Sequence, residues 1–565
     1  MAIKRFVASK DTTITNAFKS DLQTRATASN MGASDSLEVF SIYGQALETA
    51  TSSKTTELSR ILIQFPMSSI SSSRESGDIP QSGSAKFYLR MFNAVHPLTL
   101  PKTFTLTVSA LTKSWEEGTG LDMESYADKT HDQEGANWIN AGSGSSWETQ
   151  GGDYTTDNGN SAYGYSRPRG LATDASSSFV ASFTDGTEDL EIDITTLAEQ
   201  WINTQGNSDV LGSKDNYGVI ITLTSSQEAH FSGTNVASMY PGYHVISGTN
   251  YFHHTAGSIR SYYTKKFFAR GTEFFFKRPV IEVRWDSSKR DNRNSFYISS
   301  SLASGADNLN TLYMYNYVRG QLKDIPGLTA VGDGKEKLCV RIYPSSSLGK
   351  GIDQAKTLPI DGVGSVTVNA HTVITASRIE TGIYSATFAY TGSDPKIYDV
   401  WSTSSAPAFN SAGASYAEFF TGSMITVKSL SGSTPSHNPN PTHVSSITNL
   451  KPVYTSEETA RFRLYVREKD WNPTIYTKAS SDIESKTIEN AYYRVFRVSD
   501  SLDVVKYGTG SANLNYTRLS YDISGNYFDL DMSLLERDFA YGIKFIYYIN
   551  KKYTEQSEVF KFRVE

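Results

Sequence analysis

The sequence lacks the features that mark three common classes of protein. Only one of its 565 residues is a cysteine, Cys339, so an internal disulfide is excluded and a small buried thiol is expected. No run of 18 apolar residues occurs, which argues against a helix that spans a membrane. With 53 basic and 59 acidic residues, the chain has no basic excess of the kind that nucleic-acid-binding proteins use.

The N-terminus also lacks an apolar run of signal-peptide length. Residues 1–6 begin directly in sequence that has the pattern of a folded domain. We therefore expect the protein to be made in the cytoplasm, without an export signal of its own.

The residues that are abundant favour sheets and turns. The chain holds 34 Tyr, 28 Phe and 41 Gly, and only 20% of its residues are charged. Aromatic residues are enriched in strands, and Gly is enriched in turns. A chain of this length is expected to form two to four domains, each with its own core. Composition thus predicts an all-β protein with turn-rich loops.

Residues 189–223 carry the clearest local pattern in the chain. Isoleucines alternate with acidic residues at its start, which is the period of a strand with one wet face. A short helix is predicted next, with Thr196 and Glu199 as a capping box and Trp201 as the anchor that buries it. The apolar run at 219–223 predicts a strand that is covered on both faces.

Two polar stretches divide the chain into three predicted domains. Residues 286–294 are polar and charged, and residues 432–443 are rich in Pro and Asn. The strand predicted at 381–388 resembles the Gly-x-Tyr strand of immunoglobulin-like sandwiches. We predict a jelly-roll-like β-sandwich with long loop insertions at 1–288, followed by two immunoglobulin-like β-sandwiches at 289–445 and 446–565.

Five phrases in the first half of the chain occur in the order found in one known family. They resemble the DNRLRE-type domain, a carbohydrate-binding-like β-sandwich of surface and secreted proteins. The phrase Trp115-Glu116-Glu117-Gly118-Thr119 is similar to that family's Trp-Glu-Gly-Thr motif. The resemblance implies a jelly-roll-like sandwich for this part of the chain. The matching segments are 59–70, 85–92, 111–119, 189–223 and 278–283.

Other segments resemble structural proteins of T4-like marine phages, especially cyanophages. The resemblance implies a virion component of the neck, tail or baseplate, present in multiple symmetric copies and bound to other virion structural proteins. A particle released by lysis would also reconcile a surface-type fold with assembly in the host cytoplasm. The resemblance to phage structural proteins implies neither binding to nucleic acid nor association with a membrane. The segments that carry it are 307–313, 315–322, 469–473, 489–496 and 524–531.

Two long polar insertions, at 116–187 and 225–272, contain most of the candidate contact residues. Loop aromatics are used both at protein interfaces and as platforms for sugar rings. Two hypotheses therefore stay open, contact with neighbouring subunits and recognition of a host surface glycan. The candidate residues are Trp138, Trp147, Tyr154, Tyr163, Tyr243 and Tyr251.

The sequence offers weak candidates for chemistry, and we predict neither an enzyme nor a bound cofactor. Glycoside hydrolysis needs two carboxylates at a set separation, but neighbours such as Glu116 and Glu117 are expected to diverge. His253 and His254 adjoin each other on a predicted strand and so face apart. A Gly-rich loop allows either a plain turn or a Ca²⁺ site. The residues concerned are Asp122 and Glu124 for the acids, and Asp153, Asp157, Asn158 and Asn160 for calcium.

Overall fold

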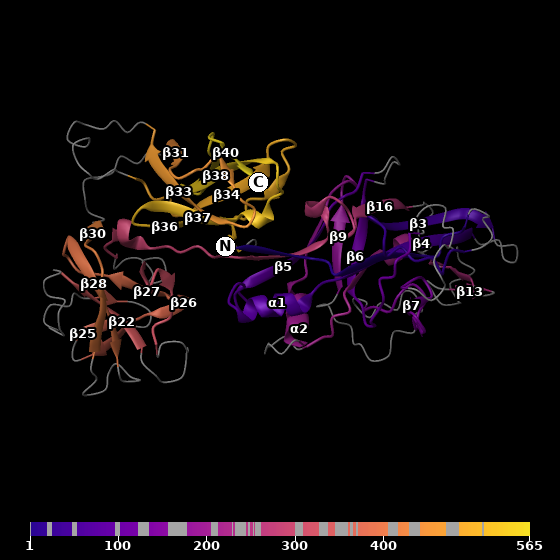
Figure 1. Ribbon diagram of the computed structural model, residues 1–565, viewed down its shortest axis with the longest axis horizontal. Coiled ribbons are helices and arrows are strands. Elements are labelled where there is room, and N and C mark those ends of the chain that lie inside the picture. The colour runs from indigo at the N-terminus through magenta and orange to yellow at the C-terminus, as the bar shows by residue number, and fades with distance from the viewer. Residues whose placement is uncertain are drawn as a thin grey trace. The chain divides into compact units, whose positions relative to one another are not determined.

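The fold was analysed in a computed structural model, which forms two compact units, Ala2–Trp285 and Asp286–Glu565 (Figure 1). Strands dominate both units, so the predicted all-β class is confirmed. No helix in the described part of the chain is long and apolar enough to span a membrane. The structure describes residues 2–19, 25–47, 54–95, 102–121, 135–155, 178–204, 213–228, 230–231, 244–246, 249–251, 253–254, 262–299, 309–326, 337–344, 360–361, 365–368, 371–404, 416–428, 441–469, 485–510 and 514–565.

The N-terminal unit is a sandwich of two antiparallel sheets. The smaller sheet has the strand order β1 (Ile3–Val7), β17 (Val280–Trp285), β5 (Ala85–Met91), β10 (Leu190–Asp193). The larger sheet has the order β16 (Tyr262–Phe268), β3 (Ser36–Leu47), β4 (Lys54–Gln64), β11 (Val219–Leu223), β6 (Phe104–Ala110), β9 (Ser178–Phe183), with β2 (Lys10–Thr15) beside β4. The first strand of the unit pairs with its last, which closes the domain on itself.

The main core of this unit lies between the two sheets. Phe87 and Leu89 from the smaller sheet and Ile61 and Leu106 from the larger one belong to the same buried cluster. Two helices add to it, α1 (Met67–Glu75) and α2 (Thr195–Thr204), which lie beside each other near β5 in Figure 1. Period-two alternation in the strands supplies these inward residues.

The strand, helix and strand predicted for residues 189–223 are confirmed as β10, α2 and β11. Trp201 is completely buried in the main core, as its predicted anchoring role requires. The predicted capping box is wrong, because α2 begins at Thr195 and Thr196 already lies inside it. Glu199 instead binds the guanidinium of Arg74 on α1 through both oxygens, at 2.5 and 2.7 Å.

Short elements complete the N-terminal unit. The pair β7 and β8 forms a small hairpin, β13 and β14 are antiparallel, and β12 and β15 are parallel. Their bounds, with those of two short helices, are β7 (Asn140–Gly142), β8 (Ser145–Ser146), β12 (His230–Phe231), β13 (His244–Ile246), β14 (Thr249–Tyr251), β15 (His253–His254), α3 (Ser225–Glu228) and η3 (Phe275–Lys277).

The C-terminal unit begins with an immunoglobulin-like sandwich. Its larger sheet has the order β18 (Phe296–Tyr297), β30 (Ile425–Lys428), β28 (Lys396–Ser404), β22 (Lys337–Tyr343), β25 (His371–Thr375), β24 (Ser365–Val368), with β29 (Tyr416–Thr421) beside β28. The opposing sheet holds β19 (Asn310–Tyr315), β27 (Ile383–Tyr390) and β23 (Ile360–Asp361), with β26 (Ser377–Glu380) beside β27. A hairpin, β20 (Tyr317–Val318) and β21 (Gln321–Leu322), follows β19.

Two sequence expectations for this sandwich are confirmed. Cys339 is fully buried on β22, and burial raises the pKa of its thiol to about 12. Tyr384, from the Gly-x-Tyr strand, is buried, and its hydroxyl accepts a hydrogen bond of 2.9 Å from the backbone N–H of Ile325. The tyrosine thus fixes a loop to the sheet, as in other immunoglobulin-like sandwiches.

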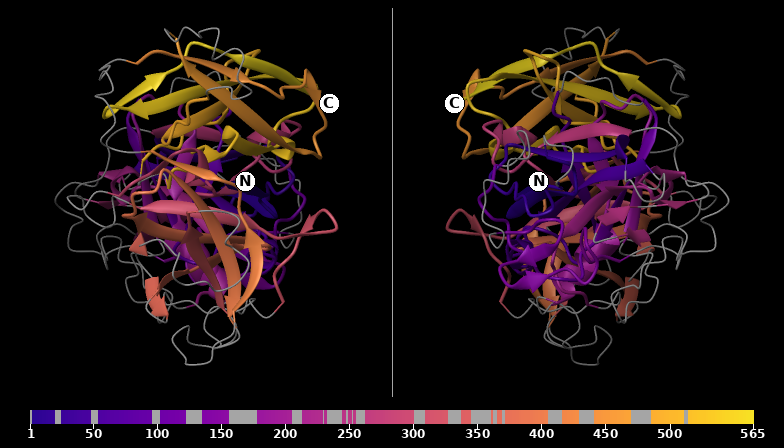
Figure 2. Two further views of the ribbon diagram at one scale, coloured as in Figure 1. Left: turned by 90° about the vertical axis from the view of Figure 1, so that its left-hand side faces the viewer. Right: turned by 90° about the vertical axis from the view of Figure 1, so that its right-hand side faces the viewer.

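A second immunoglobulin-like sandwich completes the unit, and Figure 2 shows its layers in orange and yellow. One sheet has the order β31 (His443–Ile447), β33 (Thr459–Glu468), β37 (Gly525–Asp531), β36 (Ser520–Asp522). The other has the order β32 (Val453–Tyr454), β40 (Phe560–Val564), β38 (Ala540–Ile549), β34 (Ala491–Arg497), β35 (Asp503–Val505), with β39 (Lys552–Glu555) beside β38.

Aromatic rings fill the core of this last sandwich. Tyr493 stacks on Phe528 of the opposing sheet with ring centroids 4.2 Å apart, and Phe545 meets Phe528 edge-on at 6.0 Å. Tyr541 forms a corner: its hydroxyl donates to the carbonyl of Glu536 at 2.9 Å and accepts from the same residue's N–H at 2.7 Å. In this sandwich, many aromatic side chains therefore pack in the core.

The polar stretch 286–294 is fixed to the last sandwich. The backbone of Asp291 donates to Tyr521 at 3.0 Å, and Tyr521 donates back to Lys289 at 2.9 Å. Within the turn η4 (Asn292–Asn294), Arg293 binds Asp399 of β28 through two nitrogens, both at 2.5 Å. This stretch therefore contacts both sandwiches of the C-terminal unit.

Candidate functional site

Residues 111–121 and 135–155 fold back over the larger sheet of the N-terminal unit. Strands β4 and β11 carry apolar side chains on their outer face as well as on the core face, among them Leu62 and Ile220. Aromatic residues of the segment cover that outer face and form a second buried cluster, which we call the outer core. Its members are Ile14, Leu58, Leu62, Leu111, Trp115, Ala136, Trp138, Ala141, Trp147 and Ile220, with Tyr154 and Tyr217 packed against them.

Trp138 and Trp147 were candidates for contact with a glycan or a neighbouring subunit, but the structure buries both. Only 1% of Trp138 and 5% of Trp147 is exposed. The indole N–H of Trp147 donates to the carbonyl of Asn137 at 2.8 Å, and the backbone carbonyl of Trp138 accepts from Gly151 at 2.7 Å. Burial of an apolar ring is favourable whenever a sheet offers an uncovered apolar face, and β4 and β11 offer one. Neither ring can stack on a sugar in this arrangement.

A buried ion pair joins the outer core to the sheet. Arg60 of β4 binds both carboxylate oxygens of Glu228, at 3.1 and 2.7 Å, and its third nitrogen donates to the carbonyl of Gly151 at 2.7 Å. The guanidinium also lies 5.1 Å from the ring centroid of Trp138 and 5.6 Å from that of Tyr154. The charged pair therefore lies beside two aromatic rings. Each of the three guanidinium nitrogens of Arg60 donates a hydrogen bond, two to Glu228 and one to Gly151.

The remaining predicted contact residues divide into one that is described and three that are not. Tyr154 packs against the outer core, and burial raises the pKa of its hydroxyl. Tyr251 lies in β14, but its side chain is outside the described residues. Tyr163 and Tyr243 also lie outside them. A contact role for these three tyrosines stays a prediction.

The acids of the Trp-Glu-Glu-Gly phrase diverge. Glu116 accepts from the backbone N–H of Ser143 at 2.9 Å, whereas Glu117 binds Arg270 at 3.1 and 2.7 Å and also accepts from the backbone of Asp11 at 2.9 Å. These are contacts that hold loops in place. Asp122 and Glu124 lie outside the described residues.

Asp11 is the most perturbed carboxyl of this region. It is buried, and burial raises its pKa to about 7, with the nearby charge of Glu117 acting in the same direction. The backbone N–H of Arg270 donates to it at 2.5 Å. The group is enclosed between strand β2 and the chain after β16, so we treat it as a structural carboxyl that titrates near neutral pH.

The candidate metal ligands are only partly described. Asp153 is buried and accepts from the backbone N–H groups of Glu148 and Thr149, both at 2.9 Å, which is the geometry of a turn. Its expected companions, Asp157, Asn158 and Asn160, lie outside the described residues, as do the side chains of His253 and His254 on β15. In the described ranges, no group of three or more His, Cys, Asp or Glu side chains could hold a metal ion. Calcium binding stays a prediction.

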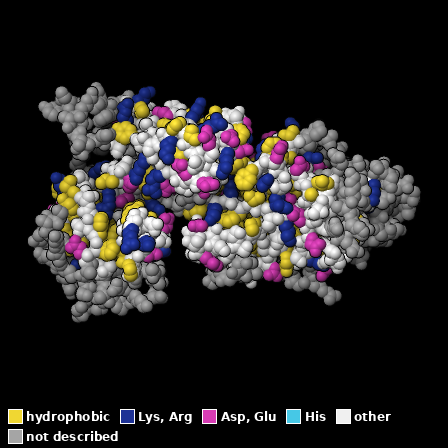
Figure 3. Space-filling model, in the orientation of Figure 1, with side chains coloured by type: hydrophobic (Ala, Val, Ile, Leu, Met, Phe, Trp, Pro, Cys, Tyr) yellow, Lys and Arg dark blue, Asp and Glu magenta, His cyan; other side chains and the backbone are white. Residues whose placement is uncertain are grey.

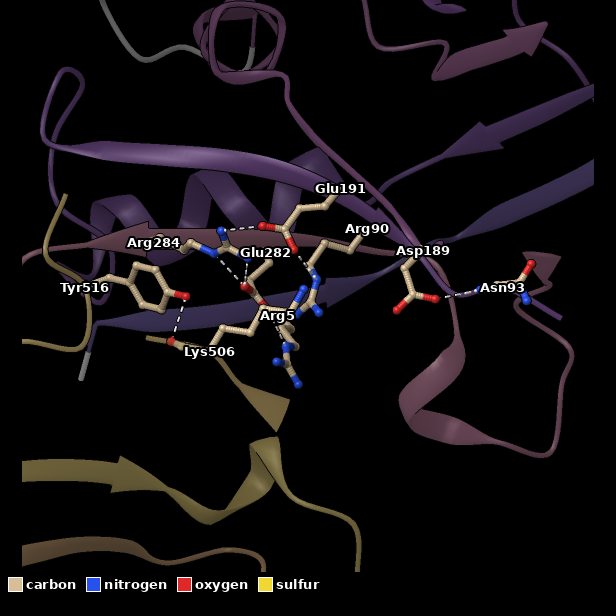
Figure 4. Close-up of polar contacts among 9 residues, drawn as sticks. All are labelled: Arg5, Arg90, Asn93, Asp189, Glu191, Glu282, Arg284, Lys506 and Tyr516. Atoms are coloured by element: carbon tan, nitrogen blue, oxygen red, sulfur yellow. Dashed lines mark hydrogen bonds and ion pairs between the residues drawn. The ribbon is translucent and has the colours of Figure 1, made fainter. Parts of the chain in front are cut away.

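The smaller sheet carries a charged cluster that the sequence analysis missed. Glu282 accepts from Arg5 at 2.7 Å, from Arg90 at 2.7 Å and from Arg284 at 2.6 Å, and Arg284 also binds Glu191 at 2.8 Å (Figure 4). Burial alone would raise the pKa of Glu282, but the charges of the three arginines outweigh it and lower that pKa. A carboxylate held ionised by three guanidinium groups is a poor base, so the cluster is suited to stabilising the sheet.

The described surface does offer exposed aromatic rings at another place. Phe274 and Phe275, at the start of η3, are 47% and 50% exposed. Lys277 lies 5.5 Å from the ring centroid of Phe274, and Arg278 lies 5.3 Å from that of Phe275. We call these four residues the Phe274 surface. On the face shown in Figure 3, basic and acidic side chains are interspersed over the described residues.

Comparisons with known proteins add little. No protein-family model matches the chain, and no curated protein does. A solved marsupial T cell receptor is similar over 42% of this chain and 66% of its own, just under two thirds, with 9% identity and a TM-score of 0.14. The solved FN1–FN3 domains of chicken CNTN1 are similar over 54% of this chain and 82% of their own, with 12% identity and a TM-score of 0.14. Similarities this weak carry no argument about function.

Proposed function

We propose that the protein is a non-enzymatic structural component of a tailed-phage virion, which acts through contacts with other virion proteins. The proposal combines the resemblance of five segments to structural proteins of marine phages with the tandem arrangement of sandwiches. Each of the three sandwiches closes its own core, so each is suited to serve as a rigid module in an assembly.

The Phe274 surface is the observation that carries this proposal furthest. Half-exposed phenylalanines at adjacent positions are costly in water, and each is flanked by a cation near its ring. Protein interfaces are enriched in aromatic rings and in Arg at their centres. A neighbouring subunit that covers Phe274 and Phe275 would remove both rings from water. Trp138 and Trp147, in contrast, do not support the glycan hypothesis, because both rings are buried and cannot stack on a sugar.

The experiment is a purification of phage particles followed by mass spectrometry and imaging of the assembled virion. We expect the chain at a fixed copy number per particle, at the neck, tail or baseplate. Its absence from mature particles would end the proposal.

A variant test links the Phe274 surface to assembly. In a complementation assay, Phe274→Ser with Phe275→Ser should leave the chain folded and remove it from the particles. The matched control is Val559→Ser, which changes another exposed apolar residue, in the C-terminal unit. Equal incorporation of both variants would contradict a role for this surface.

A further inference from the structure

The C-terminal unit contains a polar cleft of about 310 Å³ that none of the sequence motifs indicated. Its walls come from the turn after η4, from the end of β30, from the end of β33 and from the chain before β34. A volume near the lower end of the range for ligand pockets fits a ligand of one or two small rings. Because the lining is mostly polar and charged, the cleft is unsuited to an apolar ligand.

One buried hydroxyl in the cleft has no partner among the residues that the structure describes. Ser295 is only 6% exposed, and its hydroxyl makes no hydrogen bond within the described part of the chain. Its backbone N–H is satisfied by the carbonyl of Asn292 at 3.0 Å, so the local turn does not need the hydroxyl. Leaving a buried hydroxyl unsatisfied costs about 1–3 kcal/mol. A ligand in the cleft would satisfy it.

Two cations in the lining also have no carboxylate partner among the residues that are described. Lys428 lies 5.7 Å from the ring centroid of Tyr297, and Arg467 donates only to the backbone carbonyl of Glu468, at 3.3 Å. By comparison, Lys486 in the same cleft is paired with Glu468. The cleft therefore holds two cations that no described carboxylate pairs with, which favours a ligand with a negative group.

The other lining groups match a polyol. The hydroxyl of Thr487 and the amide of Asn294 lie 3.3 Å apart and face the cleft together with Ser295. Tyr297 is 41% exposed and adds an aromatic ring. Glu489 is half-exposed and lies 3.9 Å from Arg290, and its carboxylate can also accept hydrogen bonds from a ligand that donates. A sugar presents several hydroxyls that donate and accept, whereas inorganic phosphate near neutral pH has at most two O–H donors.

We propose that this cleft binds an acidic saccharide, a sugar that carries a carboxylate. Lys428 and Arg467 would bind the carboxylate, Ser295 and Thr487 would bind ring hydroxyls, and Glu489 would accept from them. The site lies outside the residues first considered for glycans, and the proposal does not depend on a virion location.

The test is isothermal titration calorimetry on the full-length chain with glucuronic acid, with glucose as the neutral match and inorganic phosphate as the competing anion. We expect saturable binding of glucuronic acid and at least about tenfold weaker binding of glucose. Lys428→Gln and Arg467→Gln should each weaken glucuronic acid binding by about tenfold. The matched control Arg537→Gln, an exposed arginine of the same unit outside the cleft, should not change it.

Ser295→Ala separates a ligand-binding role from a structural one. Because the hydroxyl has no partner among the described residues, its removal should leave the melting temperature unchanged or raise it, yet weaken glucuronic acid binding by about fivefold. The proposal is overturned if glucuronic acid does not bind saturably, or if either cation variant binds it as the unaltered chain does. If glucose binds as tightly as glucuronic acid, the cations have no role in binding and the proposal is wrong. If inorganic phosphate binds as tightly as glucuronic acid, the cleft recognises an anion and not a sugar, which also overturns the proposal.

Discussion

The buried ion pair between Arg60 and Glu228 gives the sharpest prediction about stability. The side chains are only 1% and 4% exposed, and the contacts at 2.7 and 3.1 Å are bidentate. Glu228→Gln keeps the shape but leaves the guanidinium buried without its counter-charge. Breaking a buried pair in this way costs about 3–5 kcal/mol. The double variant Arg60→Met with Glu228→Leu removes both charges, and replacing a buried pair by apolar residues is often neutral.

One contact modifies the expectation for the double variant. Arg60 also donates to the carbonyl of Gly151 at 2.7 Å, so its loss leaves that carbonyl without this bond. An unsatisfied buried acceptor costs about 1–3 kcal/mol. We therefore expect the double variant to be destabilised by no more than about 3 kcal/mol, which is less than Glu228→Gln alone in spite of its two changes.

The assay is native-state hydrogen exchange, because a chain with several cores does not unfold in a single two-state step. In Glu228→Gln, amides of β4 and of residues 135–155 should exchange about 10²–10⁴ times faster, which corresponds to the loss of about 3–5 kcal/mol. Amides of the last sandwich should be unchanged.

The control is Asp78→Asn, which breaks the exposed pair between Lys4 and Asp78 at 3.0 Å. An exposed pair contributes about 1 kcal/mol or less, so exchange should change by less than about fivefold. The reasoning is refuted if Glu228→Gln behaves like Asp78→Asn, or if the double variant is the least stable of the set.

Three further predictions concern other residues. Trp138→Ala should lower the stability of the N-terminal unit by about 3–5 kcal/mol, measured by the same exchange experiment, and unchanged protection of residues 135–155 would contradict the outer core. Burial raises the pKa of Asp11 from 3.8 to about 7. The contribution of Asp11 to the free energy of unfolding is therefore full below pH 3.8 and is lost as the pH rises to about 7. The loss is up to about 1.4 kcal/mol per pH unit. Asp11→Asn should therefore gain stability over the unaltered chain between pH 4 and pH 7 in denaturant titrations, and a difference that does not vary with pH would be inconsistent with this pKa. Tyr541→Phe should cost about 1–2 kcal/mol by loss of both bonds to Glu536, with Tyr553→Phe on the exposed strand β39 as a near-neutral control.

The fold could be predicted where the sequence pattern is local. The alternation before α2, the position of Trp201 and the apolar run of β11 depend on residues close in the chain, and all three are confirmed. The capping box failed because α2 begins at Thr195, and Glu199 binds Arg74, which lies 125 positions away in sequence. A charged partner that the chain brings in from a distance is invisible to a local pattern.

The burial of Trp138 and Trp147 was missed for a related reason. A polar segment with tryptophans looks the same in sequence whether it projects into water or folds back on a sheet. The available signal was β11, whose apolar residues face both sides and therefore require a cover on each. The cleft was beyond sequence reasoning, because Ser295 and Thr487 lie almost 200 positions apart and neither belongs to a motif.

The outer core also determines where this protein can be engineered. Residues 135–155 are part of the packed interior, so most of this loop should not tolerate an inserted tag. Gly151 has φ +88°, and even a methyl group there would lie 2.8 Å from a nitrogen of Arg60. Gly144, at the tip of the hairpin between β7 and β8, meets nothing within 4 Å. A fluorescent label or an affinity peptide for imaging the assembly therefore belongs at the tip and nowhere else in this segment.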